Sequence, residues 1–107
     1  MAEFSTELTP AQIERLAVLM EECAEVQQVI GKILRHGLFS RHPMGGPPNV
    51  DLLETELGDV VAAMRLLHAG DDIDIDMVND HAPLKLFKLR KYTHFQSDAI
   101  FAFAESL

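Results

Sequence analysis

Apolar residues recur every three to four positions along two long stretches of the chain, which is the spacing of an amphipathic helix. In the first stretch, about residues 10–36, they are Ile13, Leu16, Leu19, Val26, Val29, Ile30, Ile33 and Leu34. In the second stretch, about residues 49–69, they are Leu52, Leu53, Leu57, Val60, Ala63, Met64 and Leu67. The pattern therefore predicts two long helices, each with one apolar face.

Residues that favour helix ends bound these two stretches. We expect Thr9 to cap the first helix and Gly37 to end it, and Asn49 to cap the second helix and Gly70 to end it. The segment 37–48 between them holds three glycines and three prolines, so it is predicted to be a loop. It also carries an arginine and a histidine, and it is either a flap over a site or a plain connector.

The C-terminal part of the chain, about residues 76–105, is predicted to be helical in two pieces. Asp74 or Asp76 is expected to cap the first piece, which Pro83 must kink or restart. Ser97 is expected to cap the second piece, which is rich in phenylalanine.

Length and composition agree with a small all-helical protein. The 107 residues are the size of one domain, 1–107, and the 48% hydrophobic content is that of a globular chain. The predicted fold is an all-α bundle of three to four helices, built on an antiparallel helix pair. Two long helices and a short third are too few to enclose a core. We therefore expect a homodimer or homotetramer to complete it.

The net charge of −8 narrows the choice of partners. It argues against a general binder of nucleic-acid polymers or anionic membranes, which attract lysine and arginine patches. No stretch approaches the ~20 apolar residues that span a bilayer, and the N-terminus has no apolar signal segment, so a cytoplasmic protein is expected. Cys23 is the only cysteine, which allows no internal disulfide, and we expect it in the core.

Four acids lie on the apolar faces of the predicted long helices. At about 100° per residue, Glu22 and Glu56 point into the apolar stripes, and Glu25 and Asp59 lie at the edges. An unpaired buried carboxylate is costly, so basic partners, protonation or metal ions must balance the four. Because the basic residues of these helices are few and mostly six or seven positions away, we favour metal ions.

The spacing of the acids also favours a metal site. Two carboxylates at i and i+3 share a helix face and can hold one cation together. Two such pairs on facing helices give an all-oxygen site that suits Mg²⁺ or Mn²⁺ rather than zinc. A di-iron bundle uses Glu-x-x-His, which does not occur in this chain. Each pair alone is weak evidence, because Glu-x-x-Glu is common on solvated helix faces.

The run Glu21-Glu22-Cys23-Ala24-Glu25, followed after a loop by Glu56-Leu57-Gly58-Asp59, resembles the E-E-x-x-E and E-x-x-D motifs of the MazG-like all-α nucleoside triphosphate pyrophosphohydrolases. That superfamily includes dimeric dUTPases, dCTP pyrophosphatases and phosphoribosyl-ATP pyrophosphohydrolases. The basic stretches 32–37 and 88–92 also look like MazG-like proteins, and the resemblance covers about residues 12–92. The spaced double motif is fairly specific for the superfamily, but not for a substrate.

The resemblance implies Mg²⁺-dependent cleavage of an NTP or dNTP between the α and β phosphates, which gives a monophosphate and pyrophosphate. It implies that Glu22, Glu25, Glu56 and Asp59 hold the metal and are catalytic. Glu21 then orients a ligand or the attacking water, or else is a surface residue. Two alternatives stay open: a phosphoribosyl-ATP pyrophosphohydrolase, and a helical module that binds a nucleotide or metal without catalysis.

The resemblance also implies contacts to a small nucleotide substrate from five further residues, which are Lys32, Arg35, Asn49, Lys88 and Lys91. Each has a plainer interpretation. Lys32 and Arg35 also fit a solvated helix face, and helix capping alone explains Asn49. Lys88 and Lys91 either reach phosphates across a subunit boundary or form a basic helix end.

Overall fold

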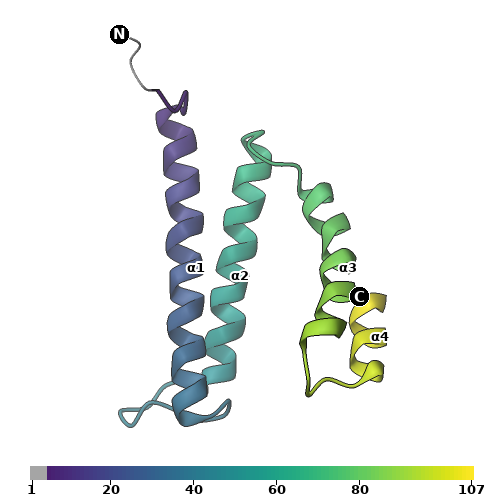
Figure 1. Ribbon diagram of the computed structural model, residues 1–107. Coiled ribbons are helices and arrows are strands. Elements are labelled where there is room, and N and C mark those ends of the chain that lie inside the picture. Colours follow the sequence, from purple (N-terminus) through teal and green to yellow (C-terminus); the bar gives the residue numbers. More distant parts are fainter. Residues whose placement is uncertain (1–4) are drawn as a thin grey trace. The chain divides into compact units, whose positions relative to one another are not determined.

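The computed structural model describes residues 5–107, and this part of the chain contains four α-helices and no β-strand. The helices are α1 (Pro10–His36), α2 (Asn49–Ala69), α3 (Ile75–Tyr92) and α4 (Asp98–Ser106), as Figure 1 shows. The all-α prediction is therefore confirmed. None of the four helices is both long enough and apolar enough to cross a membrane.

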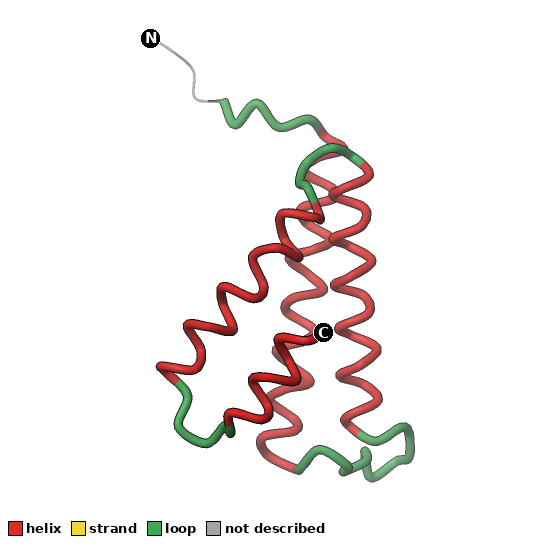
Figure 2. The backbone as a smooth tube through the Cα atoms, turned by 90° about the vertical axis from the view of Figure 1, so that its right-hand side faces the viewer, coloured by secondary structure: helices red, strands yellow, loops and turns green. Residues whose placement is uncertain are grey.

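The chain divides into two compact units, which are described separately. The first extends to Ile73 and contains α1 and α2, and the second runs from Asp74 to Leu107 and contains α3 and α4. Within the first unit α1 and α2 lie side by side along their lengths, and the loop 37–48 joins them (Figures 1 and 2). The antiparallel helix pair is confirmed, whereas the single domain 1–107 stays a prediction.

Small and branched apolar residues form the seam between α1 and α2. Val29, Ala63 and Leu67 are buried, and Leu67 is the most enclosed side chain, with 1% of its surface exposed. All three belong to the apolar stripes of the sequence pattern. Burial of each aliphatic side chain contributes about 1.5–3 kcal/mol relative to exposure, less for alanine, so the seam is what holds the two helices together.

An ion pair closes the end of the hairpin opposite the loop. The Arg15 guanidinium donates to both carboxylate oxygens of Asp72, one contact being 3.1 Å, and Gln12 Nε2 donates to Asp72 Oδ1 at 3.2 Å. Gln12 also accepts from the backbone N–H of Thr9 at 2.9 Å in the expected capping box. Asp72, just after α2, is thus tied to the first turns of α1.

Asn49 ties the other end of the hairpin, in a way that the sequence did not predict. Pro48 occupies the N-cap position, and Asn49 is the first residue of α2. The Asn49 side chain is 6% exposed, and its Nδ2 donates to the Gly37 carbonyl at 3.1 Å, while its backbone N–H donates to Ser40 at 2.9 Å. The capping prediction was wrong because the returning loop brings the C-terminal end of α1 within reach of this amide.

The second unit confirms two predicted caps. Asp74 caps α3 and Ser97 caps α4 through side-chain oxygens that accept backbone N–H groups. Of the two effects predicted for Pro83, a kink or a restart of the helix, the restart is wrong, because α3 runs through Pro83 as one helix. The proline removes one hydrogen bond to Asn79, but both residues are exposed, so water can reach the freed carbonyl.

Arg90 joins α3 to α4. Its guanidinium lies 5.1 Å from the centre of the Phe101 ring, and it pairs with Glu105 at 3.1 Å and with Asp98 at 3.6 Å. Phe101 is buried, so the phenylalanine-rich tail packs on α3 through this one ring. Cys23, in contrast, was expected in the core and is exposed, because it lies on the face of α1 that α2 does not cover.

Substitution by alanine should have opposite effects at two glycines, one within α2 and one at its C-terminal end. A Cβ on Gly58 would meet no atom within 4 Å, whereas a Cβ on Gly70 would overlap the guanidinium of Arg15. Gly58→Ala should therefore raise the free energy of unfolding by about 1 kcal/mol, the usual gain in an exposed helix interior. Gly70→Ala should lower it by displacing Arg15 from Asp72. Urea denaturation of both variants measures the two changes; a loss of stability in Gly58→Ala contradicts this account.

Candidate metal centre

Four carboxylates meet midway along the helix pair. Glu22 and Glu25 of α1 and Glu56 and Asp59 of α2 each offer one carboxylate oxygen, and these four oxygens lie within 4.8 Å of one another. The i, i+3 spacing turns both members of each pair toward the facing helix. The structure thus brings together the four predicted metal ligands.

The cluster lies partly in the apolar seam and partly in solvent. Glu22, Glu25 and Glu56 are half-buried, whereas Asp59 is exposed. The carboxyl of Glu25 lies close to those of both Glu22 and Glu56. Asp59 is therefore the member of the cluster that is most accessible to water.

Two oxygen atoms of the cluster have no partner. Glu22 Oε2 and Glu56 Oε2 are buried and accept no hydrogen bond. A buried acceptor without a partner is rare in folded proteins, because its loss of hydration costs about 1–3 kcal/mol or more when the group is charged. A hard divalent cation prefers oxygen ligands of this kind, so the residues fit Mg²⁺ or a similar ion.

The crowding of like charges raises two pKa values. Burial, followed by the neighbouring charges of Glu25 and Asp59, raises the pKa of Glu22 above its ordinary value. The hydrogen bond with Glu25, followed by burial and the same neighbouring charges, raises the pKa of Glu56. Without a cation the folded protein therefore holds protons in this cluster at higher pH than separate glutamates would.

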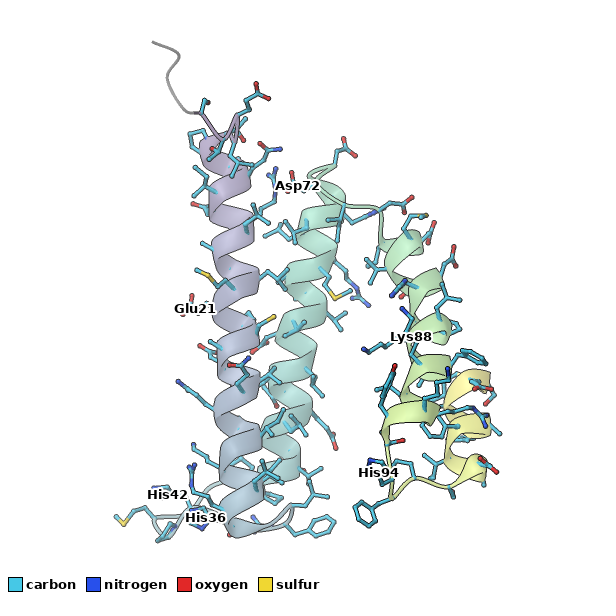
Figure 3. All side chains as sticks on the ribbon, viewed as in Figure 1. Glu21, His36, His42, Asp72, Lys88 and His94 are labelled. Carbon is cyan, nitrogen blue, oxygen red and sulfur yellow. The ribbon has the colours of Figure 1, made fainter. Side chains whose placement is uncertain are left out.

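Three other predicted site residues lie outside the cluster. Glu21 is exposed, and Figure 3 shows it on the side of α1 that faces away from α2. Lys88 and Lys91 belong to α3 in the second unit, whereas the cluster belongs to the first unit. The roles expected of these three residues stay predictions.

The remaining predicted residues line a pocket at the loop end of the hairpin. Lys32, Arg35 and Asn49 surround a cavity of about 530 Å³ together with His36, Arg41 and His42, among others. Figure 3 shows His36 and His42 close together there. The sequence pattern indicated Arg41 and His42 only as part of a loop that is either a flap over a site or a plain connector, and it gave His36 no role of its own.

Comparison with known proteins adds no relative. No protein-family model, no curated protein and no solved structure matches this chain. The features of the chain that bear on its function are therefore the geometry of the cluster and the resemblance of its motifs.

The raised pKa values predict a pH-dependent loss of stability in metal-free buffer. Glu22 and Glu56 bind protons more tightly in the folded chain than at the unfolded value of 4.5. Their contribution to stability is therefore fully present below that pH, and it is lost as the pH rises through the raised folded values. At pH 7, Glu56→Gln should raise the Tm because it removes one repelling charge.

Glu54→Gln is the matched control, because Glu54 is an exposed acid one half-turn away on the same helix. Thermal denaturation between pH 4 and pH 8 without divalent ions should show the Tm gain in Glu56→Gln alone. An equal or lower Tm for Glu56→Gln at pH 7 would contradict the like-charge repulsion.

Proposed function

We propose that this chain is a divalent-cation-dependent nucleoside triphosphate pyrophosphohydrolase that resembles the MazG-like proteins. It would cleave an NTP or dNTP to the monophosphate and pyrophosphate. The observation that carries the proposal is the convergence of Glu22, Glu25, Glu56 and Asp59, with two buried oxygens that lack any partner. Their sequence order also matches both acidic motifs of that superfamily.

The residues of the cluster have distinct parts in this proposal. Glu22, Glu25, Glu56 and Asp59 would hold Mg²⁺, or Mn²⁺, through their carboxylate oxygens. A bound cation would neutralise the polyphosphate and lower the pKa of a coordinated water. Asp59, the exposed member, lies where the substrate can enter. The apolar seam at Val29 and Ala63 limits water behind the carboxylates, which strengthens their hold on a cation.

We further propose that a second copy of the chain covers the outer face of α1. Five exposed apolar residues lie along this face: Ile13, Leu16, Met20, Ile30 and Leu34. Cys23 and Gln27 occupy the two positions between Met20 and Ile30, so that the spacing along the face alternates between three and four residues. Such alternation is the pattern of a helix that packs lengthwise on another helix. A homodimer or homotetramer would bury this stripe and give the four-helix core that one hairpin lacks.

Hydrolysis is tested by incubating the purified protein with a panel of ribo-, deoxy- and modified nucleoside triphosphates. We expect pyrophosphate release that needs Mg²⁺ or Mn²⁺. Glu56→Gln should lower kcat at least a hundredfold, because Glu56 would hold the cation that neutralises the negative charge of the reacting phosphates. Glu54→Gln, which changes an exposed acid of the same helix, should keep the wild-type rate.

The same assay separates the rival functions. Turnover of phosphoribosyl-ATP alone would assign the protein to that narrower activity. Tight nucleotide binding by calorimetry without any product would favour a binding module. Full activity in Glu56→Gln would refute the role of the cluster.

The outer stripe of α1 is tested by placing a charge in its centre. Met20 is 72% exposed, and Met20→Lys should turn the predicted dimer or tetramer into a monomer because a lysine at a packed helix seam is costly. Gln28→Lys adds the same charge on the polar face and should leave the assembly unchanged. Sedimentation velocity measures both. An active wild-type monomer would overturn this proposal.

A further inference from the structure

The pocket at the loop end of the hairpin is unusually basic for an acidic protein. Five of its lining residues are cationic or can become so: Lys32, Arg35, His36, Arg41 and His42. No aspartate or glutamate lines it. The chain as a whole has a net charge of −8, so this pocket is a local reversal of sign.

The basic side chains of the pocket have no acidic partners. The arginines elsewhere that hold the fold together, Arg15 and Arg90, are both paired with carboxylates. Within residues 5–107, none of these five side chains takes part in an ion pair. All five side chains are exposed, so water can solvate them, but basic groups gathered on one side of a pocket attract an anion.

The loop holds its basic groups in place and keeps donors available. One Arg41 N–H donates to the Gly46 carbonyl at 3.1 Å, which leaves the rest of the guanidinium free to bind a ligand. His42 Nδ1 accepts the backbone N–H of Met44 at 3.0 Å, so its ring proton lies on Nε2. Gly45 and Gly46 have φ angles of 96° and 122°, which side-chain-bearing residues rarely adopt, and these let the loop turn back on itself.

The first backbone N–H groups of α2 already donate hydrogen bonds within the protein, so they are not available to bind an anion. The N–H groups of Asn49 and Val50 donate to loop carbonyls of Ser40 and Leu38, each at 2.9 Å. The next N–H, that of Asp51, donates to the carbonyl of Pro48. Recognition in the pocket therefore falls to the side chains, and arginine guanidinium groups bind phosphate oxygens in a forked, two-bond geometry.

The pocket also lies close to the carboxylate cluster along the helices. Leu52, which lines the pocket, is one turn from Glu56, about 6 Å along the axis. Lys32 is two turns from Glu25, about 10 Å. The Arg35 guanidinium folds back along α1 to within 3.4 Å of the position that a Cβ on Gly31 would take.

We propose that this basic pocket is a metal-independent binding site for a phosphate group. The loop 37–48 and the end of α1 build it, and Arg35 and Arg41 are its main anchors. Its volume of about 530 Å³ leaves room for the phosphate together with part of the molecule that carries it. The pocket would also be a second anchor for the substrate, one to two turns from the cations, and this role rests on the proposed function. The binding of phosphate by the pocket does not depend on that function.

Calorimetric titration of the wild-type protein with inorganic tripolyphosphate, in buffer freed of divalent ions, tests the pocket without turnover. We expect saturable binding of one ion per chain. Arg35→Gln and Arg41→Gln should each weaken it about tenfold, the loss expected for one charge-assisted contact. Lys85→Gln, which removes an exposed cation from α3, is the matched control and should change the affinity less than twofold.

Glu56→Gln should not weaken tripolyphosphate binding, because Glu56 does not line the pocket and its charge has the same sign as that of the ion. No saturable binding, or equal losses in Arg41→Gln and Lys85→Gln, would overturn the phosphate site. In the hydrolysis assay Arg41→Gln should raise KM with little change in kcat. An unchanged KM alongside weakened tripolyphosphate binding would overturn the second-anchor role alone.

Discussion

The first unit depends on holding four like-charged groups in the seam of a helix hairpin. Carboxylates whose oxygens lie within 4.8 Å of one another push α1 and α2 apart unless protons or cations intervene. Two clamps oppose this force, one at each end of the hairpin. Asp72 accepts from Arg15 and Gln12 at one end, and Asn49 donates to Gly37 at the other. The apolar contacts of Val29, Ala63 and Leu67 complete the restraint.

Helices and their ends were largely predictable because they depend on local chemistry. The capping box at Thr9, the caps at Asp74 and Ser97, and the ends at Gly37 and Gly70 follow from side-chain types at fixed positions. The errors arose where the surroundings of a residue decide. Asn49 has a cap-like sequence context, but contact with the end of α1 uses its amide instead. Pro83 predicts a break in α3, but the helix continues through it because the freed carbonyl of Asn79 is open to solvent.

The carboxylate cluster could be predicted because periodicity carries information about facing residues. Glu22 and Glu56 each point into an apolar stripe, so one antiparallel pairing of two stripes brings them together. No comparable sequence pattern predicts the pairing of Arg15 with Asp72, because the two residues are 57 positions apart and lie on different elements. The basic pocket could be foreseen only in part, from the arginine and histidine of the loop, because its shape depends on how the loop folds back. Periodicity fixes the face of a helix, but it does not fix the path of a loop.

The distribution of charge along the hairpin links its two candidate sites. A divalent cation would balance the negative charge of the carboxylates, and a phosphate would balance the positive charge of the basic pocket. A complex of Mg²⁺ with a polyphosphate contains both charges in one ligand, and the separation of about one to two helical turns suits an extended molecule. A binding site for cations alone would explain Glu22 and Glu56 but would leave Arg35 and Arg41 without compensation. This is the physical reason to prefer a phosphorylated substrate over a simple metal-storage role.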